Sequence, residues 1–113
     1  MEKEQSTGGR RALAFAVRER GAVLQTVTGG QALAREYGYA SSEEDVLIAE
    51  TRTSDSYLRL IERLEHGEYA ALVIYGLSHL NQDAELLLQL RARCTVLVVR
   101  PRAVYRHLVA AEA

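Results

Sequence analysis

The chain has 113 residues, a formal net charge of −1 at pH 7 and a hydrophobic content of 48%, values that predict one domain with a single core. The balanced charge excludes a global basic field that would attract nucleic acid, and no apolar run is long enough to span a bilayer. Cys94 is the single cysteine, which excludes an internal disulfide; we expect a buried, inert thiol and a cytoplasmic location.

The first residues, 1–11, are polar and charged and include Gly8-Gly9. They lack the apolar side chains needed for packing, so we expect a flexible N-terminal segment. Residues 12–113 are then expected to form the single domain. Its first element is a strand, Ala12–Val17, followed by a charged turn.

Residues 22–37 have a helical pattern toward their end. Gly29-Gly30 lies inside this stretch, and each glycine disfavours a helix by about 1 kcal/mol relative to alanine. We therefore expect a broken helix, or one that begins only after Gly30. Gly38 is expected to end it in the left-handed conformation.

A second strand, Val46–Ala49, is followed by a polar connection in which Ser54 or Asp55 can cap the next helix. That helix is predicted to run to about Glu65 and to be ended by Gly67. Its core face is predicted to carry four side chains at helical spacing, namely Tyr57, Leu58, Ile61 and Leu64.

The run Ala70–Tyr75 is short, apolar and rich in β-forming residues, which indicates a strand buried on both faces. A leucine-rich helix over residues 83–92 and a fourth strand, Val96–Val99, follow. Pro101 prevents the ladder from continuing, and residues 103–111 have a last, short helical pattern.

This alternation of strands and helices predicts an α/β fold with a mainly parallel, four-stranded sheet and helices on both faces. Ligands of such sheets bind at the carboxyl ends of the strands, yet the segment after the third strand, residues 77–82, holds no carboxylate and no arginine. No metal site is expected, because the three histidines stand far apart with no second ligand at helical spacing. No cofactor is expected either, because neither glycine pair has the context of a phosphate loop or a dinucleotide site.

The segment from Tyr57 to Gln82 resembles the N-terminal catalytic domain of the serine recombinases, the resolvase and invertase family. Members of that family show a helix that ends in a glycine, an apolar strand and then an Asp-Arg-Leu-Ser-Arg motif. Ala34–Tyr39 is similar to the helix end that precedes the family's second strand. The resemblance extends over Ala12–Arg100 and implies a resolvase-like three-layer sandwich.

The positions that carry the family's catalytic residues hold other residues here. Phe15–Glu19 matches a Tyr-x-Arg-x-Ser motif with a valine for the arginine and a glutamate for the nucleophilic serine. Serine attack on a phosphodiester needs that nucleophile and a cluster of fixed cations, so we predict that the chain is not an enzyme. The degenerate positions are Val17, Glu19, Ser54, Ser78, His79 and Gln82.

Five arginines and no acid occur between residues 91 and 107. Three interpretations stay open: a solvated surface with some ion pairs, a contact with an acidic partner surface such as another copy's acidic loop at residues 43–45, or a contact with nucleic-acid phosphate. The last lacks interleaved aromatic residues and a reading helix. The arginines are Arg91, Arg93, Arg100, Arg102 and Arg106.

The expected terminal helix over residues 103–111 either packs on the sheet or pairs with its symmetry mate. We hypothesise a homodimer through this helix and the leucine-rich face Ala84–Leu90. The contact residues of the helix would be Val104, Tyr105, Leu108 and Val109.

The function expected from these observations is a catalytically inactive, resolvase-like module for protein interaction or regulation. Its partner is expected to be a protein, including a second copy of itself, and neither a membrane nor a small-molecule substrate. The alternative is an accessory DNA-associated factor that binds phosphate through the basic segment Arg91–Arg106.

Overall fold

The computed structural model describes residues 10–21, 23–51, 53–80 and 83–108. These residues form a five-stranded sheet with the strand order β2-β1-β3-β4-β5. The first four strands run parallel, and β5 runs antiparallel to β4. The strands are β1 (Ala12–Val17), β2 (Val46–Ala49), β3 (Ala71–Ile74), β4 (Thr95–Val98) and β5 (Ala103–Tyr105).

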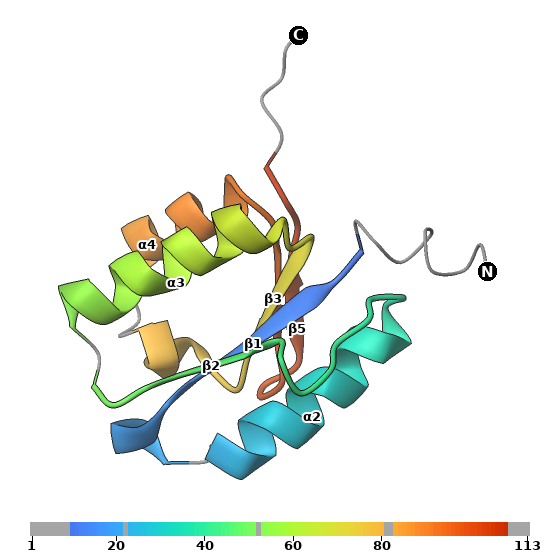
Figure 1. The fold of residues 1–113 in the computed structure, drawn as a ribbon, viewed down its shortest axis with the longest axis horizontal. Coiled ribbons are helices and arrows are strands. Elements are labelled where there is room, and N and C mark those ends of the chain that lie inside the picture. Colours follow the sequence, from blue (N-terminus) through green and yellow to red (C-terminus); the bar gives the residue numbers. More distant parts are fainter. Residues whose placement is uncertain (1–9, 22, 52, 81–82, 109–113) are drawn as a thin grey trace, which may run out of the picture.

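Helices cover the sheet on both sides. Figure 1 shows α2 on one face and α3 and α4 on the other. The helices are α2 (Val23–Glu36), α3 (Ser54–Gly67) and α4 (Ala84–Arg91), and two short 3-10 helices, η1 (Arg18–Arg20) and η2 (Leu77–Leu80), follow β1 and β3. The predicted α/β class, with helices on both faces of a mainly parallel sheet, is confirmed.

The central strands β1, β3 and β4 are buried along their whole length, because helices exclude water from both of their faces. A larger core on the α3 and α4 side contains Phe15, Ile74 and Leu60. A smaller core on the α2 side contains Val73 and Leu97. The continuous apolar runs in the sequence reflect this burial on two sides.

Helix α2 runs without a break through Gly29 and Gly30, so the prediction of a broken helix is wrong. A Cβ atom at Gly30 would lie 2.8 Å from Cγ1 of Val73 in β3, which is too close for an ordinary contact. The missing side chain therefore allows α2 to approach the sheet. Tertiary packing of this kind outweighs the low helix propensity of glycine.

Helix α3 begins at a cap that the sequence did not single out. The side chain of Thr53 accepts a hydrogen bond from the backbone amide of Ser56 at 3.2 Å, so Thr53 is the N-cap instead of Ser54 or Asp55. All three residue types cap helices well, and for this reason the sequence does not distinguish between neighbouring candidates.

The C-terminal end of α3 also differs from the prediction. Glu68 adopts the left-handed conformation with φ of 55°, while Gly67 remains helical. A side chain at Gly67 would collide with the ring of Tyr69, so packing explains this glycine. At Gly38, after α2, φ is 86°, which confirms the predicted left-handed helix end.

The segment after β4 is a strand and not a helix, so the predicted terminal helix and the count of four strands are both wrong. A turn over residues 99–102, which contains the cis peptide Arg100-Pro101, reverses the chain. Val104 then lies opposite Leu97 in an antiparallel ladder. Valine and tyrosine favour strands, and the edge of β4 supplies the ladder partners that stabilise one.

This strand also changes the predicted dimer contacts. Val104 packs against the smaller core and Tyr105 against the larger one, so the two side chains point to opposite faces of the sheet. Leu108 is 44% exposed, and Val109 lies outside the described residues. The three described residues, Val104, Tyr105 and Leu108, do not form one helical face.

Candidate functional site

The carboxyl ends of β1 and β3 lie next to each other. The chain leaves β1 toward β2 on one side of this pair and leaves β3 toward β4 on the other side. Open α/β sheets bind their ligands at such a switch point. The segments that follow these two strands, η1 and η2, therefore form the candidate site.

The structure brings four of the six degenerate positions to this edge. Val17 and Glu19 lie at the end of β1, and Ser78 and His79 lie in η2. Ser54 starts α3, and its side chain is outside the described part of the structure, as is all of Gln82.

The charges at the end of β1 do not suit a phosphodiester. Glu19, which stands where the resembled family has its serine, is exposed, and its amide donates a hydrogen bond to the carbonyl of Glu50 at 3.1 Å. Arg18 and Glu50 form an exposed ion pair with 3.2 Å between Nε and Oε2. A phosphate here would face the carboxylates of Glu19 and Glu50, and the nearby cation, Arg18, is already paired with Glu50, whereas phosphoryl chemistry requires a cluster of fixed cations.

His79 in η2 is not available to a ligand, because it is only 2% exposed. The hydroxyl of Tyr57 donates a hydrogen bond to the His79 carbonyl at 3.2 Å, and the ring of Tyr75 lies 6.2 Å from the imidazole, centroid to centroid. The imidazole is thus buried within the fold beside Tyr75, which directly follows β3. It serves the packing of η2, which a sequence-based assignment to the site does not reveal.

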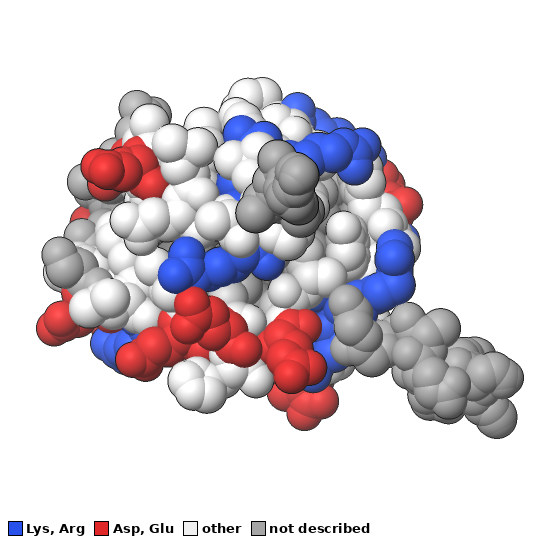
Figure 2. Space-filling model, turned by 90° about the horizontal axis from the view of Figure 1, so that it is seen from above, with Lys and Arg blue, Asp and Glu red and all other residues white. Residues whose placement is uncertain are grey.

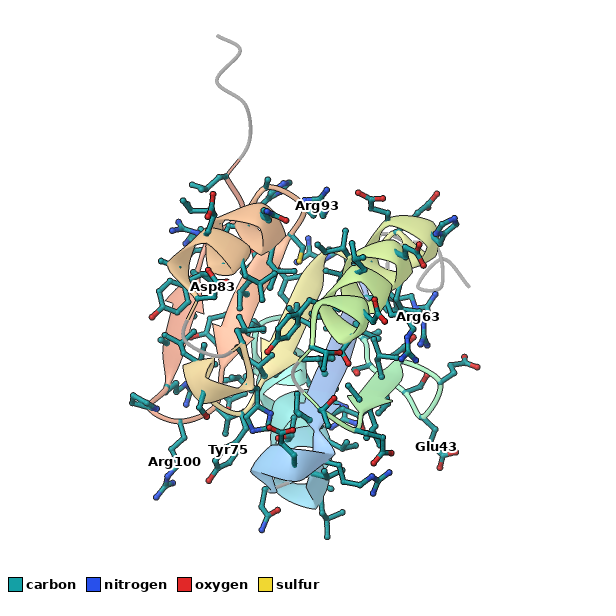
Figure 3. The ribbon with its side chains drawn as sticks, turned by 90° about the vertical axis from the view of Figure 1, so that its left-hand side faces the viewer. Glu43, Arg63, Tyr75, Asp83, Arg93 and Arg100 are labelled. Carbon is teal, nitrogen blue, oxygen red and sulfur yellow. The ribbon has the colours of Figure 1, made fainter. Side chains whose placement is uncertain are left out.

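The turn before η2 is closed by the hairpin that follows β4. A Cβ atom at Gly76 would lie 3.1 Å from the carbonyl oxygen of Arg100, and the Arg100 amide donates to the Tyr75 carbonyl at 2.8 Å. Figure 3 shows Tyr75 and Arg100 at the same end of the sheet. The backbone of the protein itself therefore occupies the space beside β3.

The opposite, amino edge of the sheet contains a polar network that the sequence analysis missed. Asp45, which precedes β2, forms an ion pair with Arg11, which precedes β1. The hydroxyl of Tyr69, which precedes β3, donates to Oδ1 of Asp45 at 2.7 Å, and the amide of Ser42 donates to Oδ2 at 2.9 Å. The sequence does contain one indication of this network: Arg11, Asp45 and Tyr69 each directly precede a predicted strand, and the amino ends of parallel strands lie at one edge of the sheet.

The network determines the protonation of its members. Burial alone would raise the pKa of Asp45, but hydrogen bonds from Ser42, Tyr69 and Arg11 outweigh burial and lower it. Burial and the hydrogen bond to Asp45 raise the pKa of Tyr69. Asp45 is therefore a carboxylate and Tyr69 a neutral phenol at neutral pH, and together they hold three strand ends.

The five arginines of the basic segment divide between two ends of the sheet. Arg91, Arg93 and Arg106 lie where β4 begins and β5 ends, whereas Arg100 and Arg102 lie in the turn between these strands. Figure 3 shows Arg93 and Arg100 at opposite ends, and Figure 2 shows acidic and basic side chains interspersed on one face.

Some of these arginines already have acidic or backbone partners. Arg93 pairs with Glu65 at 2.8 Å, Arg102 pairs with Glu36, and Nε of Arg91 donates to the Arg106 carbonyl at 2.9 Å. This agrees most simply with the first interpretation, a solvated surface with ion pairs. It does not provide one continuous phosphate-binding face.

Apolar surface is present between α3 and α4. A hollow of about 320 Å³ there is lined by residues that include Tyr57, Ile61 and Leu86. Leu58 beside it is 58% exposed, so its predicted place in the core is wrong. Leu88 on α4 is 54% exposed.

The two outer strands of the sheet are open along one side. Among the described residues β2 pairs only with β1, and β5 pairs only with β4. Ile48 in β2 is 38% exposed. An uncovered strand presents unpaired amides and carbonyls with which another chain can pair.

Cys94 is fully buried, as predicted. Burial raises the pKa of its thiol to about 12, so the thiolate needed for nucleophilic chemistry does not form at neutral pH. In the described part of the chain, no three His, Cys, Asp or Glu residues lie close enough to hold a metal ion, and no helix there is long and apolar enough to cross a membrane.

Comparison of the chain with protein-family models, with curated proteins and with solved structures found no match.

Proposed function

We propose that the chain is a non-catalytic protein-interaction module on a resolvase-like α/β fold and that it associates with copies of itself. The observation that carries the proposal is that the outer strands β2 and β5 each pair with a single neighbouring strand among the described residues, and that Ile48 on β2 is partly exposed. Natural proteins usually protect such edges. An edge left open is a surface suited to pairing with another chain.

The prediction that the protein does not cleave DNA is supported by the residues at the carboxyl ends of β1 and β3, where a resolvase-like enzyme would hold its catalytic residues. Glu19 stands in the place of the nucleophile, and His79 is buried within the fold. We expect no covalent protein–DNA adduct on supercoiled plasmid, and an adduct would contradict the proposal.

The alternative, an accessory DNA-associated factor, has less support. Arg93 and Arg102 already pair with glutamates, and the basic residues divide between two ends of the sheet. Phosphate-driven binding would still have a clear signature, because it weakens steeply as salt increases.

Two measurements on the full chain test the proposal. Sedimentation velocity from micromolar to near-millimolar protein is expected to show a sedimentation coefficient that increases with concentration. Fluorescence anisotropy with labelled duplex DNA at low salt is expected to show no binding. A monomer at every concentration would refute self-association, and strong salt-dependent binding to DNA would favour the alternative.

A further inference from the structure

We propose that strand β5 of one copy adds to strand β2 of the next, so that copies associate head to tail. This inference rests on the self-association proposed above and specifies its contact. The two strands are the opposite edges of one sheet. Figure 3 shows Arg100, in the turn before β5, on one side of the molecule and Glu43, in the loop before β2, on the other.

The residues that flank the two strands differ in charge, although Arg59 and Arg63 of α3 also lie beside β2. Arg102 and Arg106 flank β5, and both are exposed. Glu44 and Glu50 flank β2, and both are exposed as well. Arg102 and Glu50 have partners within the chain, but exposed ion pairs contribute little to stability and can exchange partners.

The backbone of β2 has groups that point outward. The amide of Ala14 donates to the Asp45 carbonyl at 2.9 Å, and Ala14 lies opposite Val46 in a parallel ladder. In such a ladder alternate residues bond to the neighbouring strand. The amide and carbonyl of Ile48 therefore point away from β1, toward the open edge.

The same reasoning applies to β5. The backbone amide of Thr95 donates to the Ala70 carbonyl at 3.1 Å, so the backbone of Thr95 bonds toward β3. The backbone of the next residue, Val96, therefore bonds toward β5, where Val96 lies opposite Tyr105. Along β5 the backbone groups of successive residues point alternately toward and away from β4, and those of Tyr105 point toward it. The amide and carbonyl of Val104 therefore point away from β4.

These directions define one register. An antiparallel pair with Ile48 opposite Val104 exchanges both backbone hydrogen bonds and places Leu47 opposite Tyr105. Tyr105 and Leu47 both pack on the α3 and α4 side of their sheets, so residues opposite each other share a face, as a continuous sheet requires. Two residues further along, Arg102 lies opposite Glu50.

A hollow beside β2 fits the incoming strand. It measures about 320 Å³ and is lined by Leu47, Glu62, His66, Arg59 and Arg63. In the proposed register Tyr105 approaches it on the same face as Leu47. Arginine already lies over this ring within the chain, with 5.9 Å between the Arg91 guanidinium carbon and the ring centroid, and Arg59 or Arg63 can add a similar contact.

The contact joins two different surfaces of the same chain, so a pair of copies keeps one free β2 and one free β5 to which further copies can add. Because β5 has only three residues, each contact is weak. Association is therefore expected at high protein concentration and to decrease with salt, which screens the exposed charges.

Charge exchange across the contact provides the test. Arg102→Glu and Glu50→Arg each place like charges opposite one another, and each variant alone is expected to raise the dissociation constant measured by sedimentation velocity about fivefold. An equimolar mixture of the two variants restores opposite charges at every contact between unlike variants, so its association is expected to exceed that of either variant alone and to approach the wild-type level. Arg93→Glu is the matched control, because it also breaks one ion pair with a glutamate and changes the charge equally.

The outcomes separate the two proposals. If wild-type protein associates but the single variants do so equally well, or their mixture shows no recovery, the β5–β2 contact is refuted while self-association stands. If wild-type protein stays monomeric at every concentration, both proposals fail.

Discussion

The amino ends and the carboxyl ends of the parallel strands, called the amino edge and the carboxyl edge of the sheet, differ in how their charged and polar side chains are buried and paired. At the amino edge a buried carboxylate, Asp45, accepts hydrogen bonds from Arg11, Tyr69 and Ser42. At the carboxyl edge the charges of Arg18 and Glu50 are exposed, and His79 in η2 is buried.

The difference shows where this fold concentrates its electrostatic energy. A charge pair removed from water is expensive to break, whereas an exposed pair is screened and contributes little. The amino edge is therefore expected to determine stability. At the carboxyl ends of the strands the charged side chains of Arg18, Glu19 and Glu50 are exposed, and Arg18 is already paired with Glu50.

The largest expected effect comes from Asp45→Ala. The substitution leaves Arg11 and Tyr69 without their shared partner and is expected to lower the free energy of unfolding by about 3 kcal/mol. Urea denaturation measures it. Glu43→Ala, an exposed carboxylate of the same loop, is the control and is expected to cause a change of less than about 0.5 kcal/mol.

Removal of one tyrosine hydroxyl at each end of the strands compares the two ends directly by the loss in the free energy of unfolding. Tyr69→Phe removes a hydrogen bond to a carboxylate and is expected to cost about 2 kcal/mol, while Tyr57→Phe removes a bond to the neutral carbonyl of His79 and is expected to cost about 1 kcal/mol. Equal losses in urea denaturation would contradict the proposed difference between the edges.

The pH dependence of stability tests the contribution of the Asp45 carboxylate. The pKa of Asp45 is lowered in the folded state, so the carboxylate stabilises the fold fully above its unfolded-state pKa of about 3.9. This contribution is lost as the pH falls through the lower, folded-state pKa. Urea denaturation between neutral and acid pH should show that the difference between wild type and Asp45→Asn shrinks below that point; a constant difference would oppose the assignment.

The smallest effect is expected at the carboxyl edge. Arg18→Ala removes the exposed partner of Glu50 and is expected to leave the midpoint of thermal unfolding almost unchanged. A large decrease would mean that this edge also contributes strongly to stability.

Much of the fold could be predicted because burial leaves a clear pattern. The runs Ala12–Val17 and Ala70–Tyr75 are apolar throughout, and strands covered on both faces need such runs. The position of the candidate site also followed from the sequence, since it depends only on where these strands end. The burial of His79 did not follow from the sequence, because it depends on contacts with residues outside η2 such as Tyr75.

Two errors share one physical cause. The continuous α2 depends on the close approach of Gly30 to Val73, and β5 depends on the free edge of β4. Local propensity contains neither interaction, so by itself it predicts a helix break at the glycine pair and a helix for the short apolar pattern that forms β5. The amino-edge network was missed for a similar reason, because Arg11, Asp45 and Tyr69 are distant in the sequence.

The sequence by itself determined the α/β class and the central strands, because the hydrophobic pattern is a local property. Only the tertiary structure decided that the sheet has a fifth, antiparallel strand and that β2 and β5 are its outer strands. Such features arise when segments far apart in the chain meet, and the free energy of those contacts exceeds the preferences of any single segment.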